Sequence, residues 1–296
     1  MKQATERGVE IDVLWGQEEN ARKESRKKER LSAIEIVQIL KNNPVIDSCR
    51  DTLRFHEQST RSHAKAVVFD PEEQGQYVAL IGSCNWLASG YASVEASVCL
   101  RSAGIVREVL KCLARMVHAG SGSRSRMTER LLEMATRLRS RDPSRSSNAR
   151  AALIIDDAHN DCMLRVRDEA RERILLVSHR MGPVARPGAL VPLAVACGKG
   201  KASAKVFYGR LEVVNPLLSQ WESDAARHGV ALKPIRNPRV HAKLLAWDDT
   251  VVISSQNWLS ADPGESQMVR ELGVMIDSPG VGALAMEVFE SQIQGD

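Results

Sequence analysis

Short apolar runs alternate along this chain with longer stretches whose apolar positions recur at helical spacing. Because strands are short and helices are longer and periodic, this alternation predicts an α/β fold with a mixed sheet in each half. The predicted strands cover about 9–16, 52–57, 63–69, 77–83 and 94–100, then 173–178, 203–208, 230–235, 241–247, 250–255 and 270–276. The predicted helices cover about 17–42, 103–118, 188–197, 215–228 and 280–293, with one bridging helix around Met127–Leu138.

An eight-residue pattern, His-Ala-Lys-x4-Asp, occurs twice, at His63–Asp70 and at His241–Asp248, 178 residues apart. Each copy is followed by a strand-like run. A five-residue step comes next, made of a small residue, a polar residue, any residue, asparagine and tryptophan, and a glutamate comes after it. A long period of this kind predicts two copies of one supersecondary unit. A duplicated set of these residue types is what a site shared between two half-domains needs. The full set is His63, Lys65, Asp70, Ser83, Asn85 and Glu95, then His241, Lys243, Asp248, Ser255, Asn257 and Glu271.

These motifs resemble the HxKx4D signature of the phospholipase D superfamily, with its GSxN step and downstream glutamate. The resemblance covers residues from about 8 to 118 and from about 151 to 292. It is closest to the bacterial phospholipase-D-like nuclease domains of restriction and antiphage systems. It implies a pseudo-two-fold pair of α/β/α half-domains, 1–118 and 151–296, joined by a basic Ser/Arg-rich linker at 119–150.

The resemblance also implies metal-independent cleavage of a phosphodiester. One of His63 and His241 would attack phosphorus as a neutral imidazole, and the other would protonate the leaving oxygen. Lys65 and Lys243 lie two residues after each histidine, so in a strand each would point to the same face as its histidine. Their charges would hold the non-bridging oxygens. The residues leave open which histidine attacks, although family habit favours His63.

The remaining candidates would support that chemistry. Asn85 and Asn257 would donate to the phosphoryl oxygens, aided by Ser83 and Ser255, and Glu95 and Glu271 would each orient an imidazole. Asp70 and Asp248 are expected to be supportive, and they could equally open the hairpins that follow. His179 ends a strand, where side chains line clefts, so it is a candidate substrate contact, as are Arg124 and Arg126 of the linker.

The two copies differ at several positions. His63 and Asn85 are 22 residues apart, but His241 and Asn257 are 16 apart, which predicts a longer hairpin in the first copy. Ser254 stands where the family usually has glycine. The step from Asn257 to Glu271 is four residues longer than that from Asn85 to Glu95. These departures make Glu271 less secure than Glu95.

Composition fits a globular chain of 296 residues, 43% hydrophobic and 26% charged, that contains no 18-residue apolar run. The start is polar, so no signal peptide is expected. Six cysteines without CxxC spacing predict reduced, mostly buried thiols in a cytoplasmic protein. No metal-ligand spacing occurs, so we expect no metal and no cofactor.

Positive charge is concentrated in two places. Residues 119–150 hold eight arginines against three acidic residues, and residues 22–30 form a second basic cluster. In a phosphodiesterase such clusters favour a polyanionic substrate, with DNA preferred over RNA. Each cluster taken alone is equally typical of a solvated helix face or a linker.

Aligning the repeats predicts that the first half lacks the strand and helix that open the second. An upstream domain or a partner chain would then supply the missing strand. Three functions compete: a nuclease, an enzyme acting on lipid phosphodiesters such as a phospholipase or phosphatidyltransferase, and a non-catalytic nucleic-acid-binding subunit. Low aromatic content (4%) and the lack of a membrane-docking helix favour the nuclease. A role as the effector of a bacterial defence system fits this reading by analogy.

Overall fold

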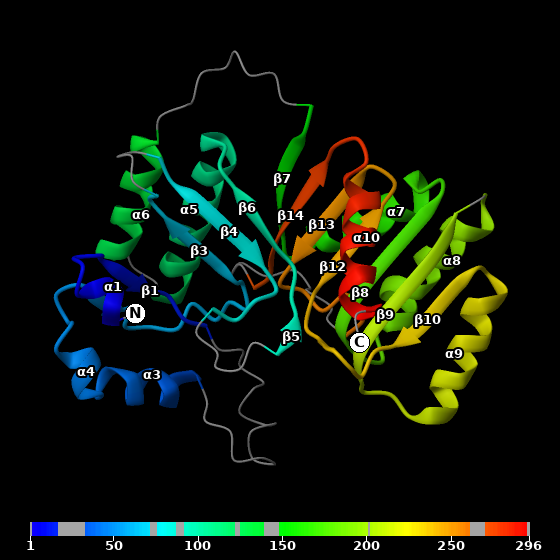
Figure 1. The fold of residues 1–296 in the computed structure, drawn as a ribbon, viewed down its shortest axis with the longest axis horizontal. Coiled ribbons are helices and arrows are strands. Elements are labelled where there is room, and N and C mark those ends of the chain that lie inside the picture. Colours follow the sequence, from blue (N-terminus) through cyan, green and yellow to red (C-terminus); the bar gives the residue numbers. More distant parts are fainter. Residues whose placement is uncertain are drawn as a thin grey trace. The chain divides into compact units, whose positions relative to one another are not determined.

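The computed structural model describes residues 2–16, 33–71, 76–86, 92–121, 125–138, 148–200, 202–260 and 270–294. These residues form two compact units. Unit 1 comprises Met1–His63, Arg107–Arg137 and Gln267–Arg270, and unit 2 comprises Ala64–Val106, Leu138–Ser266 and Glu271–Asp296. Residues 64–106 belong to the first sequence repeat but pack in unit 2. The predicted α/β class is confirmed (Figure 1).

Unit 1 is built from short elements. Strands β1 (Ile11–Val13) and β2 (Leu53–Phe55) pair in parallel, with Ile11 opposite Leu53. The short helices are α1 (Lys2–Thr5), α3 (Ala33–Lys41) and α4 (Pro44–Asp47). The long predicted helix at 17–42 is present as α3, and residues 17–32 lie outside the described part.

Two longer helices complete unit 1. Helix α5 (Ala103–Ser121) contributes its residues from Arg107 onward, and α6 (Arg126–Arg137) is the predicted bridging helix. Arg107 Nε donates to the Ala135 carbonyl at 3.2 Å, which joins the two helices. The apolar face of α6 is buried through Leu131 and Ala135, as the helical spacing predicted.

Unit 2 contains a seven-stranded mixed sheet in the order β10-β9-β8-β12-β13-β14-β7. The first three strands are parallel to one another, and the remaining pairs are antiparallel. The strands are β7 (Arg150–Ile155), β8 (Arg173–Met181), β9 (Ser203–Leu211), β10 (Val230–Pro234), β12 (Leu244–Trp247), β13 (Thr250–Ser254) and β14 (Leu272–Asp277).

Helices cover both faces of this sheet (Figure 1). One face packs against α7 (Ala158–Glu169), α8 (Val191–Gly198) and α9 (Asn215–Arg227), and a π-helical turn (Arg186–Leu190) leads into α8. The other face packs against α10 (Val281–Gln294). Along β8, Ile174 and Leu176 enter the first core and Leu175 and Val177 the second, because successive strand side chains point to opposite faces.

The first repeat contributes a three-stranded antiparallel sheet to unit 2. It runs β3-β4-β6, with β3 at Ala66–Phe69, β4 at Val78–Gly82 and β6 at Ser97–Leu100. Strand β5 (Ser93–Val94) pairs in parallel with β11 (Arg239–Val240), so that Val94 of the first repeat lies opposite Val240 of the second. The strand predicted at 94–100 is therefore broken at Glu95 and Ala96.

Cysteine burial agrees with the expectation from the sequence, since Cys84, Cys112, Cys162 and Cys197 are buried. Within the described ranges, no helix is both long and apolar enough to span a membrane.

Candidate active site

Most of the predicted site residues lie in unit 2. His63 and Arg126 lie in unit 1, and Arg124 lies outside the described residues. Arg126 is exposed at the first residue of α6. The pairing of His63 with His241 stays a prediction. The predicted residues of unit 2 are Lys65, Asp70, Ser83, Asn85, Glu95, His179, His241, Lys243, Asp248, Ser255, Asn257 and Glu271.

The prediction that each histidine and lysine lies in a strand is wrong. β3 begins at Ala66 and β12 begins at Leu244, so both His-Ala-Lys segments precede their strands. The reason is that the backbone of each segment donates hydrogen bonds to the other repeat. His241 N and Ala242 N both donate to the Val94 carbonyl, at 2.9 and 2.8 Å, and His63 N donates to the Arg270 carbonyl at 2.7 Å.

Glu95 holds the imidazole of His241. Oε1 of Glu95 lies 2.7 Å from Nδ1 of His241, and both side chains are largely shielded from solvent. Ser83 Oγ donates to the other carboxylate oxygen. Ser83 itself is fixed because its hydroxyl accepts from Ala96 N at 3.0 Å. A carboxylate that accepts from Nδ1 fixes the tautomer and leaves Nε2 for chemistry.

Electrostatics keep this pair in the carboxylate–imidazole form. Burial alone would raise the pKa of Glu95, but hydrogen bonds from His241 and Ser83 outweigh it and the net pKa is lowered. Burial lowers the pKa of His241, and the hydrogen bond to Glu95 opposes this without reversing it. His241 is therefore disposed to be neutral when no anion occupies the site.

Lys243 is fully buried and directs its ammonium group at His241. Its Nζ lies 3.2 Å from His241 Nε2 and donates to the His241 carbonyl at 2.9 Å. Burial, aided by the charge of Lys65, lowers the pKa of Lys243 to about 7. Lys65 is also buried, with 6% of its surface exposed. Lysines are rarely this buried, and the carboxylates of Glu95 and Glu271 favour the charged form of Lys243.

His179 packs against His241. The two ring centroids lie 4.9 Å apart in a T-shaped arrangement. Its Nδ1 lies 2.8 Å from the Val240 carbonyl. Burial lowers the pKa of His179 to about 4, so the ring is neutral at physiological pH. The structure thus places His179 beside the candidate nucleophile.

The second repeat reproduces the backbone pattern of the first. Ser83 N donates to the Ala96 carbonyl at 2.9 Å, and Ser255 N donates to the Leu272 carbonyl at 3.0 Å. Ser255 Oγ donates to Glu271 as Ser83 Oγ donates to Glu95. The extra residues between Asn257 and Glu271 therefore leave the serine–glutamate contact in place. That Glu271 orients an imidazole stays a prediction.

Glu271 has additional support that sequence reasoning missed. Its backbone N donates to Asp156 Oδ1 at 2.8 Å, and Asp156 N donates to the Glu271 carbonyl at 3.3 Å. Asp156 has a φ of 46°, a left-handed conformation that aspartate tolerates better than most residues. The Asp-Asp step after the apolar run Ala152–Ile155 was the available signal for this turn.

Ser254, which replaces the usual glycine, has a structural explanation. In the first repeat Gly82 lies opposite Ser97, and in the second Ser254 lies opposite Gly273. Each strand pair thus holds one glycine and one serine, but the two residues occupy opposite strands in the two repeats. A Cβ on Gly82 would lie 2.3 Å from the Ala96 carbonyl oxygen. Ser254 Oγ instead lies 2.6 Å from Nε2 of the fully buried His159.

The two asparagines differ in burial. Asn85 is exposed, whereas Asn257 is partly buried. Asn257 Oδ1 is inaccessible to solvent and finds no hydrogen-bond partner within the described part of the chain. A buried amide oxygen without a partner costs about 1–3 kcal/mol.

Asp248 has a structural position. Its carboxylate accepts from the backbone N–H groups of Arg171 and Glu172 at 2.8 and 3.1 Å, at the start of β8. Its φ is 42°, in the two-residue turn between β12 and β13. Asp70 is exposed directly after β3. These positions agree with supportive rather than chemical roles for both aspartates.

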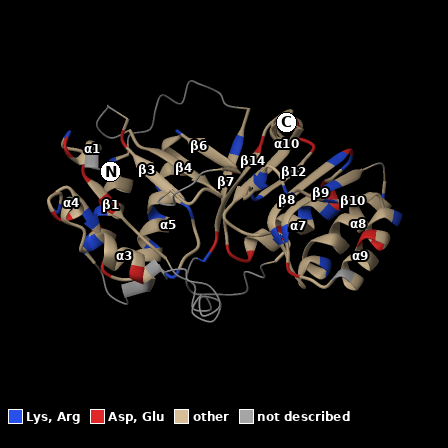
Figure 2. Ribbon diagram, turned by 60° about the horizontal axis from the view of Figure 1, so that its bottom comes forward, with Lys and Arg blue, Asp and Glu red and all other residues tan. Residues whose placement is uncertain are grey.

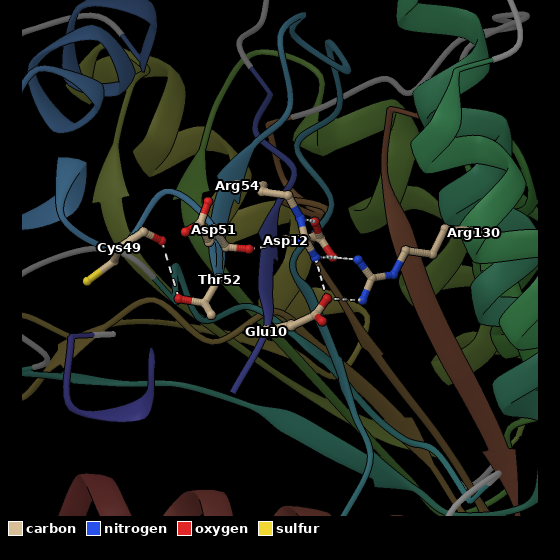
Figure 3. Close-up of polar contacts among 7 residues, drawn as sticks. All are labelled: Glu10, Asp12, Cys49, Asp51, Thr52, Arg54 and Arg130. Carbon is tan, nitrogen blue, oxygen red and sulfur yellow. Dashed lines mark hydrogen bonds and ion pairs between the residues drawn. The ribbon is translucent and has the colours of Figure 1, made fainter. Parts of the chain in front are cut away.

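One linker arginine belongs to an ion-pair network. Arg130 of α6 and Arg54 of β2 both contact Glu10, directly before β1, and Asp12 of β1 (Figure 3). The hydrogen bonds from Arg54 and Arg130 lower the pKa of Glu10. Arg130 is therefore neutralised within unit 1, which reduces the basic surface that the linker offers. Figure 2 shows acidic and basic positions interspersed in both units.

The fold of unit 2 brings together Glu95 of the first repeat with His241 and Lys243 of the second. Residues 1–117 match the family model described as "Cardiolipin synthase, PLD-like domain". No curated protein sequence matches the chain.

Several solved structures are similar. Phosphatidylserine synthase from Haemophilus influenzae Rd KW20 is 12% identical with a TM-score of 0.55, covering 97% of this chain and 73% of that one. Polyphosphate kinase from Porphyromonas gingivalis is 14% identical with a TM-score of 0.53, covering 98% and 41%. Nuc, a phospholipase D family member from Salmonella typhimurium, is 17% identical with a TM-score of 0.37, covering 48% and 91%. Residues 1–117 are thus similar to a phospholipase-D-like domain, and the chain shares its fold with phosphatidylserine synthase.

Proposed function

We propose that this protein is a metal-independent phosphodiesterase that cleaves DNA through a phosphohistidine intermediate. The observation that carries the proposal is the arrangement around His241. Glu95 holds Nδ1 at 2.7 Å, and the buried ammonium of Lys243 lies 3.2 Å from Nε2. The arrangement orients an imidazole nitrogen towards the amino group of a buried lysine. A nucleophile paired with a cation in this way suits the negative charge of a phosphodiester.

The predicted residues take complementary roles. Lys65 and Lys243 neutralise the non-bridging oxygens in place of a metal ion. Asn85 and Asn257 donate hydrogen bonds to the same oxygens. One histidine attacks while the other protonates the leaving oxygen, and the repeat assigns these roles to His63 and His241. Glu95 and Glu271 stabilise the imidazolium that forms on each histidine during the cycle.

DNA is the preferred substrate on two grounds. The chain carries a net charge of +4 with its excess concentrated at 119–150, and polyanions bind such segments through counterion release. Arg126 offers an exposed cation at the start of α6. A role as the nuclease of a bacterial defence system is part of the proposal and rests on the family resemblance.

The test is cleavage of plasmid and single-stranded DNA by the wild type in EDTA, beside His63→Ala, His241→Ala and the control His228→Ala. His228 is an exposed histidine whose ring contacts the Asp224 carbonyl, outside the site. We expect cleavage by the wild type and the control, and none by the other two, which should still bind DNA. Loss of cleavage in EDTA that magnesium restores would refute the metal-free mechanism.

Transfer of a phosphatidyl group is the second candidate, because the matched family model and one solved structure are named for lipid enzymes. Incubation with phosphatidylglycerol vesicles separates the two. Lipid turnover that requires His241, without DNA cleavage, would favour the second candidate. DNA binding without cleavage of either substrate would favour a non-catalytic binding subunit.

A further inference from the structure

A third histidine, His179, lies against the candidate nucleophile. It comes from β8, and no residue of the repeated motif corresponds to it. Its ring lies 4.9 Å from that of His241, at an interplanar angle of 63°. Edge contacts between rings at this distance are favourable and orient both partners. His179 is also bonded to the residue before His241, through Nδ1 and the Val240 carbonyl at 2.8 Å.

The hydrogen bond of His179 fixes its tautomer. A backbone carbonyl only accepts, so Nδ1 of His179 must carry the proton. Burial lowers the pKa of His179 to about 4, and the charges of Lys243 and Arg180 act in the same direction. The ring is therefore neutral across the pH range in which enzymes of this kind work. A neutral ring can cover His241 without adding charge to the site.

Several charged groups face His241, and they oppose one another. Glu95 favours the imidazolium, whereas Lys243 and Lys65 disfavour it, and burial is the largest influence. Part of that burial comes from the His179 ring. The groups that surround His241 are Glu95 before β6, Lys65 before β3, Lys243 before β12, and His179 on β8.

We propose that His179 is a positioning residue that covers the His241 imidazole, holds it neutral, and so makes His241 the histidine that attacks phosphorus. The proposal rests on the proposed phosphodiesterase function. It differs from the family habit that favours the first copy. A site of two histidines needs one neutral and one protonated ring, and a shielded His241 with Nε2 beside a lysine suits the neutral role.

The proposed reaction has two steps. Nε2 of His241 forms a bond to phosphorus while the bond from phosphorus to the leaving oxygen breaks. The leaving oxygen takes its proton from His63, and the Nδ1 proton of His241 stays in the bond to Glu95. In the second step water attacks, its proton passes to His63, and the nitrogen–phosphorus bond breaks.

The first experiment measures kcat/KM against pH for His179→Ala, His179→Phe and the control His228→Ala. Alanine lets water reach His241, so its pKa rises and the acidic limb should move up by roughly 0.5–1 pH unit. Phenylalanine keeps a ring over His241, so the limb should stay while the lost Val240 hydrogen bond lowers kcat several-fold. An unmoved limb in a folded His179→Ala, checked by circular dichroism, would overturn the proposal, as would a shift of the alkaline limb.

The second experiment identifies the nucleophile with bis(p-nitrophenyl) phosphate. Nitrophenolate leaves without a proton, so His63→Ala should still release about one equivalent in a burst, whereas His241→Ala should release none. The opposite result would overturn the assignment and leave the proposed function standing. If the wild type cleaves neither this ester nor DNA, the proposed function fails and the inference fails with it.

Discussion

Glu95 and His241 are 146 positions apart in the sequence, yet the carboxylate of the first and Nδ1 of the second lie 2.7 Å apart. The glutamate of the first repeat thus orients the histidine of the second. Backbone hydrogen bonds also join the two repeats. The Val94 carbonyl accepts from His241 N, and the Arg270 carbonyl accepts from His63 N. Each repeat therefore accepts a backbone hydrogen bond from the other.

Replacing Glu95 with glutamine should lower kcat by about 10²- to 10⁴-fold with little change in DNA binding, because the amide cannot stabilise the imidazolium or enforce the tautomer. The measurement is single-turnover cleavage together with a binding isotherm. Glu172→Gln, an exposed glutamate at the start of β8, is the matched control. Activity of Glu95→Gln within threefold of wild type would remove Glu95 from the mechanism.

Lys243→Met should abolish cleavage and stabilise the fold. The folded pKa is lowered to about 7 from an ordinary 10.5, so between these values the unfolded chain binds a proton that the folded chain does not. Stability contributed by Lys243 therefore rises with pH across that window, and the burial penalty is complete below pH 7. Methionine removes the penalty, worth about 1–4 kcal/mol.

Urea unfolding at pH 7 and at pH 10 checks this prediction. The gain from Lys243→Met should be larger at pH 7, where the wild-type lysine is more often charged. The exposed Lys205, paired with Glu290, offers the control Lys205→Met, which should change stability by less than about 1 kcal/mol. A Lys243→Met variant that is less stable than wild type at pH 7 would show that its hydrogen bonds outweigh its desolvation.

His159 and Ser254 should be energetically coupled. Nε2 of His159 and Oγ of Ser254 lie 2.6 Å apart in a fully buried setting. His159→Phe and Ser254→Ala should each cost about 1–3 kcal/mol, because each leaves a buried polar group without its partner. The double variant should cost less than the sum, with a coupling of about 0.5–3 kcal/mol from urea unfolding. If the free-energy costs of the two single substitutions simply add in the double variant, the contact between His159 and Ser254 is contradicted.

Asp248 should matter for stability and not for chemistry. Asp248→Ala removes the acceptor of backbone N–H groups and forces alanine into a left-handed turn, at a combined cost of about 2–4 kcal/mol. Asp248→Asn should cost less, because asparagine tolerates the conformation and keeps one acceptor oxygen. The melting temperature measures the cost, and cleavage per folded molecule should stay at the wild-type level. A folded but inactive Asp248→Asn would give this residue a chemical role.

Local pattern was sufficient for most of the elements. Apolar periodicity placed α5, α6, α9 and α10 and the strands β8, β9, β10, β12, β13 and β14, because each buries a face whose spacing is visible in the sequence. It did not predict β7 or α7. Strand β7 pairs with β14, and α7 packs against the adjacent core. It also merged β5 with β6, since the break at Glu95 arises from a contact with His241 and not from a local signal.

The sequence alone determined the candidate chemistry: the duplicated motifs name the residue types and their order and indicate the family that they resemble, because spacing along a chain is sufficient to mark a repeat. Tertiary structure decided the partnerships. Glu95 meets His241, His179 covers it, and His159 occupies the space beside Ser254, through contacts between residues 61 to 146 positions apart. No periodicity encodes such contacts, because they depend on which strands become neighbours and on which groups burial then forces to find a partner.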